Sequence, residues 1–222
     1  MVATDRATID YQSEVLRKAI HFCSLSIPVV YYFITKELAL SILIPLAVFS
    51  LMVDLSRYYV KPISDLFYKI FGFLLRRHER DEKKKNLNGA TYVLISAVFV
   101  ILIFPKVFVV TSFAVLIIGD IAAALVGRKY GNTPFLVKSL EGTLAFFIFS
   151  CIVVLLAPKI EGHLLEFVIG ILAVAVGAIA ENISIGWADD NLTVPVSICI
   201  VMWLLYSVLL PQMPLILANV PN

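Results

Sequence analysis

The chain has 222 residues, of which 60% are hydrophobic and only 15% are charged, and its mean hydropathy is +0.94. A soluble domain of this length does not need so much apolar surface, so the composition excludes that class and indicates a polytopic membrane protein. The net charge of +2 is uninformative as a sum, and no nucleic-acid partner is expected.

Apolar runs close to 20 residues long, the length that crosses a bilayer, recur along the chain. We therefore expect an all-α polytopic transmembrane bundle with about seven spans, folded as one membrane-embedded domain over residues 1–222. The expected spans cover residues 19–35, 38–60, 90–105, 107–127, 143–158, 164–182 and 192–210. Pro28, Pro45 and Pro195 fall inside three of these spans and can kink their helices.

Residues 62–85 differ in kind from the spans. Apolar residues recur there at helical spacing, and a strongly charged run from Arg76 to Lys85 follows them. One interpretation is an amphipathic helix with a basic end that lies against anionic headgroups. The other is a solvated cytoplasmic loop that only enforces the topology.

The distribution of Lys and Arg predicts the orientation. With a cytoplasmic N-terminus and seven spans, all 18 of these residues lie on the inner side except Lys36, Lys106 and Lys159. Such an asymmetry follows the positive-inside rule, so we expect the N-terminus in the cytoplasm and the C-terminus outside.

Under this orientation, the polar residues at the ends of the spans gather at the cytoplasmic face. Asp120 is the most informative of them, because it lies inside an apolar run about two turns before the inner end of its span. A charged side chain at the bilayer centre costs roughly 2.5–3.5 kcal/mol on insertion scales, so charges within membrane segments usually mark function. We therefore expect an active site at the cytoplasmic face.

The residue types in this layer are suited to a phosphate and a hard metal ion. The carboxylates supply the oxygen ligands that Mg²⁺ prefers, and they are Asp120, Glu141, Glu181, Asp189 and Asp190. Arg128, Lys129 and Lys138 offer positive charge to a polyphosphate, while nearby glycines leave backbone N–H groups accessible.

Several blocks of the sequence resemble the family of CTP-dependent lipid-alcohol kinases, which includes dolichol kinase, phytol kinase and the CTP-using diacylglycerol kinase. The blocks are Glu14-x-x-Arg17-Lys18-x-x-His21, Gly89-Ala90-Thr91-Tyr92, Gly119-Asp120 through Gly127-Arg128-x-x-Gly131, Lys138-Ser139-Leu140-Glu141-Gly142-Thr143, and Asp190-Asn191 with Pro195. The resemblance spans nearly the whole chain, and its most specific part is the pair of blocks between Gly119 and Thr143. It implies a helical membrane enzyme with a cytosolic CTP site and a divalent metal, and a more distant kinship with CDP-diacylglycerol synthases.

We therefore expect a kinase that uses CTP and Mg²⁺ to phosphorylate a membrane lipid alcohol, with an isoprenoid such as polyprenol, dolichol or phytol favoured by the resemblance. The expected catalytic residues are Asp120, His21, Lys138 and Glu141; the expected metal ligands are Asp120, Asp190 and Glu181; the expected nucleotide-binding residues are Arg128, Lys129, Gly127, Gly131, Ser139, Gly142, Asn191 and Thr91. The expected partners are the lipid substrate, CTP and the bilayer, and the sequence indicates no oligomer.

Three alternatives remain open from the sequence. A CTP-dependent diacylglycerol kinase would use the same residues on another alcohol. A phosphatidate cytidylyltransferase would use them for attack at the α-phosphorus. A transporter or channel predicts charges near the midplane and often internal repeats, and the one-sided clustering argues against it.

Overall fold

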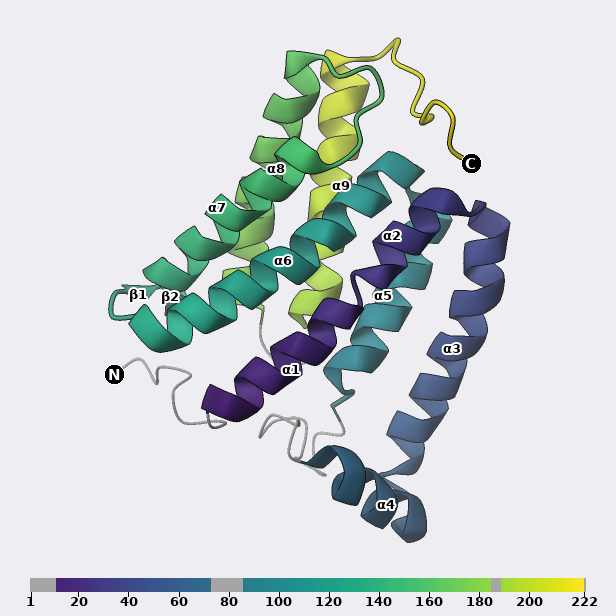
Figure 1. The fold of residues 1–222 in the computed structure, drawn as a ribbon, viewed down its shortest axis with the longest axis vertical. Coiled ribbons are helices and arrows are strands. Elements are labelled where there is room, and N and C mark those ends of the chain that lie inside the picture. The colour runs from purple at the N-terminus through teal and green to yellow at the C-terminus, as the bar shows by residue number, and fades with distance from the viewer. Residues whose placement is uncertain (1–10, 73–85, 185–188, 222) are drawn as a thin grey trace.

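The computed structural model describes residues 11–72, 86–184 and 189–221, and its elements are almost all helical (Figure 1). The helices are α1 (Tyr11–Cys23), α2 (Ser26–Phe33), α3 (Lys36–Ser56), α4 (Lys61–Phe71), α5 (Gly89–Ile103), α6 (Lys106–Tyr130), α7 (Leu140–Leu156), α8 (Leu164–Ile183) and α9 (Asp190–Leu209). A short antiparallel hairpin of β1 (Pro134–Phe135) and β2 (Lys138–Ser139) joins α6 to α7.

Helix α6 is the centre of the bundle. It packs against α1, α2, α7 and α9, and 67% of its most apolar 18-residue window is buried, against 22% for α3. Most exposed residues of α3 are nevertheless apolar, among them Phe49 and Met52. Apolar side chains on the outside of an apolar helix are suited to lipid contact, which agrees with an integral membrane protein.

Among the described residues, four helices (α3, α6, α8 and α9) are long and apolar enough to cross a membrane, while α5 and α7 are shorter apolar helices. These findings support a helical membrane protein but do not confirm seven spans. The expected span at residues 19–35 is divided into two short helices, α1 and α2.

Pro28 explains the break between α1 and α2. Its missing N–H cannot bond to the carbonyl of Ser24, and its ring would clash with that carbonyl in a continuous helix. The chain instead makes tighter bonds from Ser24 N to His21 O and from Ile27 N to Ser24 O. Pro45 and Pro195, by contrast, lie inside continuous helices.

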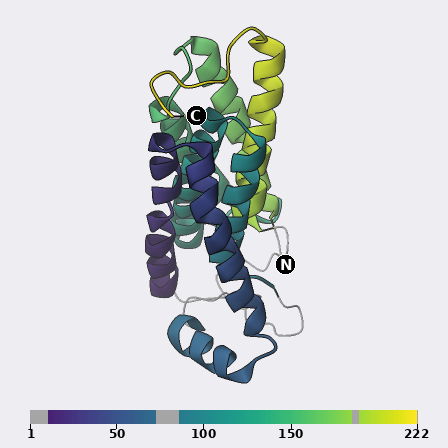
Figure 2. The ribbon, with the colours of Figure 1, turned by 90° about the vertical axis from the view of Figure 1, so that its right-hand side faces the viewer.

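Helix α4 lies at one end of the molecule below α3, whereas the C-terminal residues lie at the opposite end (Figures 1 and 2). Phe67 is buried, and the Cζ atom of the Arg57 guanidinium lies 4.8 Å from the centre of the Phe67 ring. Ile63, Leu66 and Ile70 form an exposed apolar face of the same helix. The helix covers the first part of the expected segment 62–85, and residues 73–85 lie outside the described part of the chain. Contact of α4 with headgroups stays a prediction.

Close packing of α6 on α7 fixes the position of Asp120. A Cβ atom on the neighbouring Gly119 would lie 2.5 Å from Ser150 Oγ and 2.8 Å from the Phe146 ring, both on α7. Only glycine permits this approach, so the helix backbone that carries Asp120 sits directly against α7.

Candidate functional site

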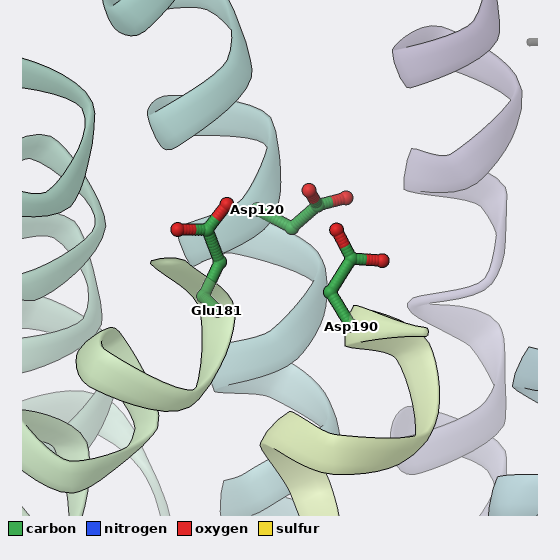
Figure 3. Close-up of side chains that lie close together, drawn as sticks. All are labelled: Asp120, Glu181 and Asp190. Carbon is green, nitrogen blue, oxygen red and sulfur yellow. The ribbon is translucent and has the colours of Figure 1, made fainter. Parts of the chain in front are cut away.

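Three carboxylates from three helices form the acidic cluster, which we define as Asp120 of α6, Glu181 of α8 and Asp190 of α9. One oxygen atom from each lies within 4.8 Å of the others, and all three residues are buried. Figure 3 shows the three side chains pointing toward one another from separate helices. The position of Asp190 follows from the start of α9, where the Asp189 side chain caps the helix by accepting a hydrogen bond from Asn191 N.

Two lysines compensate the charge of the acidic cluster. The Lys18 ammonium of α1 donates a hydrogen bond to Asp120, and both side chains are almost fully buried. Lys138 Nζ, from β2, lies 2.5 Å from Glu181 Oε1 and 3.6 Å from Asp190 Oδ2. Buried charges of one sign repel strongly unless they are paired, so these contacts allow three carboxylates to share one small space.

His21 also faces the acidic cluster. Its Nε2 atom lies 3.4 Å from Asp120 Oδ2, one helical turn beyond Lys18 on the same helix. The predicted catalytic residues Asp120, His21 and Lys138 are therefore brought together. Glu141 is placed elsewhere, because its carboxylate accepts hydrogen bonds from the backbone N–H of Thr133 and so holds the turn before β1.

The acidic cluster fits a hard divalent cation. It gathers the predicted metal ligands Asp120, Glu181 and Asp190, each of which offers a carboxylate oxygen of the kind that Mg²⁺ and Ca²⁺ prefer. The donor set contains no sulfur, so the softer transition metals are less well suited.

Asn182 of α8 positions the hairpin that carries Lys138. Its Oδ1 atom accepts hydrogen bonds from Val137 N at 2.9 Å and Lys138 N at 3.3 Å, and its Nδ2 atom donates to Thr143 Oγ1 at 2.6 Å. The neighbouring residue, Glu181, contacts the Lys138 ammonium. One turn of α8 thus fixes both the backbone and the side chain of Lys138.

The glycines of the predicted nucleotide site serve a close contact between α6 and the start of α7. A Cβ atom on Gly127 would lie 3.2 Å from Ser139 Oγ and 3.4 Å from Gly142 Cα, and one on Gly142 would lie 3.1 Å from the carbonyl of Ala123. Ser139 also caps α7, where its Oγ accepts a hydrogen bond from Gly142 N. This packing accounts for the small residues, while a role for Gly127, Gly131, Ser139 and Gly142 in nucleotide binding stays a prediction.

Arg128, near the C-terminal end of α6, meets α1 through a buried carboxylate. Its Nη2 atom lies 3.1 Å from Oε2 of Glu14, which also pairs with Arg17 through an Nη2–Oε1 distance of 2.7 Å. Lys129 is exposed, and its ammonium lies 5.3 Å from the ring centre of Tyr130.

Two further predicted nucleotide contacts have structural partners. Thr91 Oγ1 lies 2.8 Å from Ser50 Oγ in the contact between α5 and α3, and its N–H donates to Asn88 Oδ1. Asn191 donates from Nδ2 to Asp189 Oδ1, beside the acidic cluster, and its own Oδ1 is buried with no hydrogen-bond partner among the described residues.

The sequence reasoning missed Lys18, Glu14 and Asn182 as site residues. Lys18 stands in the block Glu14-x-x-Arg17-Lys18-x-x-His21, which is the signal in the sequence that could have found it, whereas its burial beside Asp120 is seen only in the structure. Glu14 and Asn182 contact segments that are far from them in the sequence, namely Arg128 and the hairpin that carries Lys138.

Comparison with known proteins gives three relatives of this chain. It is 28% identical over 195 residues to an uncharacterized protein of Rickettsia prowazekii, covering 87% of the chain and 95% of the relative. It is 30% identical over 169 residues to CTP-dependent diacylglycerol kinase 1 of Schizosaccharomyces pombe, covering 68% of the chain and 74% of that kinase. The kinase of the same name from Eremothecium gossypii is 29% identical over 175 residues, and the chain covers 54% of its length.

No protein-family profile and no solved structure matches the chain. The match to the fission-yeast kinase nevertheless combines 30% identity with coverage of about three quarters of that protein. The chain therefore belongs to the family of CTP-dependent lipid kinases.

Proposed function

We propose that this protein transfers the γ-phosphoryl group of CTP to the hydroxyl group of diacylglycerol at the cytoplasmic face of a membrane. The observation that carries the proposal is the acidic cluster with Lys18 and Lys138 in contact with it, within a chain of this kinase family. Phosphoryl transfer needs charge neutralisation and positioning more than covalent participation by the protein, and this group of side chains supplies both.

In the proposed reaction the oxygen of the lipid hydroxyl attacks the γ-phosphorus of CTP. The bond from this phosphorus to the β–γ bridging oxygen breaks, CDP leaves, and the hydroxyl proton passes to a base. Asp120 and His21, whose side chains lie 3.4 Å apart, are the groups best placed to receive it. Lys138, Arg128 and Lys129 would bind phosphate oxygens, since ammonium and guanidinium groups form charge-assisted hydrogen bonds with them.

A Mg²⁺ ion held by Asp120, Glu181 and Asp190 would neutralise charge on the phosphates of CTP. Lys18 and Lys138 already contact these carboxylates, so they also lie within reach of phosphates that approach the acidic cluster. Asn182 keeps Lys138 in this position through the backbone of the hairpin.

The acceptor is proposed from the relatives. The resemblance of motifs favoured an isoprenoid alcohol, but both kinases identified by comparison are named for diacylglycerol. The contacts of the described residues favour neither lipid tail. Diacylglycerol is therefore the first acceptor to test, and polyprenol and phytol are the second and third.

The assay uses purified protein in detergent with [γ-³²P]CTP, Mg²⁺ and one acceptor at a time: diacylglycerol, polyprenol, phytol or phosphatidate. Label in phosphatidate formed from diacylglycerol supports the proposal, and label in an isoprenoid phosphate alone would move the substrate to that class. A parallel reaction with [α-³²P]CTP and phosphatidate tests the cytidylyltransferase alternative. Labelled CDP-diacylglycerol in that reaction, with no lipid monophosphate in the first, would refute the kinase.

A further inference from the structure

Glu14 of α1 is a fully buried carboxylate that holds two arginines. Its side chain is 1% exposed, and it contacts Nη2 of Arg17 at 2.7 Å and Nη2 of Arg128 at 3.1 Å. Arg17 lies one turn further along α1, whereas Arg128 belongs to α6. One carboxylate thus brings together two guanidinium groups that are more than one hundred residues apart in the chain.

The two arginines of this group are more exposed than the carboxylate that joins them. The Arg17 and Arg128 side chains are 17% and 9% exposed, whereas the carboxylate between them is sealed. An approaching anion therefore meets the arginines and not Glu14. Two guanidinium groups held side by side suit phosphate, which arginine binds through pairs of N–H donors.

The arginine pair is linked to the acidic cluster by both of its helices. On α1, Arg17 directly precedes Lys18, whose ammonium donates a hydrogen bond to Asp120. On α6, Arg128 follows Asp120 by eight residues, which is about 12 Å along a helix axis. Because arginine side chains are long, the guanidinium groups can lie closer to the acidic cluster than the backbone positions of the arginines do. An anion that contacts both the arginine pair and a metal at the acidic cluster must therefore carry more than one phosphate group.

We propose that Glu14 is a positioning residue that holds Arg17 and Arg128 as a paired anchor for the polyphosphate of CTP. This inference rests on the proposed function and deepens it, because it assigns the triphosphate to a defined surface of α1 and α6. Glu14 itself does not touch the nucleotide. It overcomes the repulsion between the guanidinium groups and fixes the direction in which they point.

A purely structural role for Glu14, as a link between α1 and α6, predicts a different result. Loss of such a link would lower thermal stability and weaken every ligand of the site alike. Loss of a polyphosphate anchor would weaken the binding of CTP much more than the binding of CMP, because CMP carries the same base but only a single phosphate group.

The experiment compares Glu14→Gln with the wild-type protein by equilibrium dialysis against labelled CTP and labelled CMP, in detergent with Mg²⁺. Glutamine keeps the shape of the side chain but removes the charge that pairs the arginines. We expect the Kd for CTP to rise at least about tenfold, which corresponds to one lost charge-assisted hydrogen bond, and the Kd for CMP to change less than about twofold. Glu37→Gln, at an exposed position near the start of α3, is the matched control and should leave both constants unchanged.

The second variant is Arg128→Lys, which keeps a positive charge beside Glu14 but loses the fork of N–H donors. It should also raise the Kd for CTP about tenfold and leave the melting temperature unchanged. The inference therefore remains testable if Glu14→Gln does not fold. The role of Glu14 would be overturned if the Kd for CTP in these variants stayed within twofold of the wild-type value, or if the Kd values for CTP and CMP rose equally. Wild-type protein that binds no CTP would instead refute the proposed function itself.

Discussion

Lys138 Nζ lies 2.5 Å from Glu181 Oε1, so one ammonium group connects the β-hairpin after α6 to the last turn of α8. The same ammonium lies 3.6 Å from Asp190 at the start of α9. Lys138 is 28% exposed while both carboxylates are buried, so it lies at the border between the acidic cluster and solvent. Under the proposed function, Lys138 is placed to contact the phosphates of a nucleotide that approaches from solvent.

We expect Lys138→Met to lower kcat by at least about a hundredfold, because a neutral side chain cannot stabilise the charge that develops on transferred phosphate. Lys138→Arg should retain more activity than Lys138→Met, since it keeps the positive charge. Initial rates with saturating CTP and lipid measure both effects. Equal rates for Lys138→Met and the wild type would show that Lys138 only compensates the acidic cluster.

Asp120→Asn should abolish turnover while the protein remains folded. The change removes a charge that the proposed metal would require, but the amide oxygen can still accept a hydrogen bond from Lys18. We expect kcat to fall at least about a hundredfold, with normal elution on size-exclusion chromatography. Asp65→Asn, at an exposed position of α4, is the matched control. Full activity in Asp120→Asn would remove this residue from the mechanism.

Gly119→Ala should destabilise the contact of α6 with α7. The new Cβ atom would come within 2.8 Å of the Phe146 ring, closer than packed carbon atoms approach, and we expect a cost of about 1–3 kcal/mol. Gly72→Ala is the control, because its nearest neighbour is Tyr68 Cβ at 3.7 Å. Thermal unfolding in detergent should show a lower melting temperature for the first variant alone, and identical curves would show that the two helices can separate without cost.

The predicted orientation can be tested by labelling with a membrane-impermeant maleimide. In a variant without Cys23, Cys151 and Cys199, a cysteine introduced as Asp65→Cys should react only from the cytoplasmic side. One introduced as Glu161→Cys, in the exposed loop between α7 and α8, should react only from the other side. Reaction of both from the same side would contradict the orientation derived from Lys and Arg.

The sequence predicted the helical membrane class because apolar composition and run length are local properties. It also predicted Asp120, Glu181 and Asp190 as metal ligands and Lys138 as a catalytic residue, and the structure brings these four side chains together, while their binding of a metal stays a prediction. Buried charges are costly in an apolar chain, so their presence is informative before any contact is known. The number of spans was less predictable, because Pro28 divides the first expected span and α5 and α7 are short.

The pairing of charges was decided only by the tertiary structure. Lys18 and Asp120 are 102 residues apart, Lys138 and Glu181 are 43 apart, and no periodicity relates them. The same holds for Glu14, because its ion pair with Arg128 joins α1 to α6. A sequence shows which charged groups an apolar chain must accommodate, because burying a charge costs free energy wherever it lies in the fold. Which groups share that cost depends on the approach of distant helices, and here small residues such as Gly119, Gly127 and Gly142 set that approach for α6 and α7.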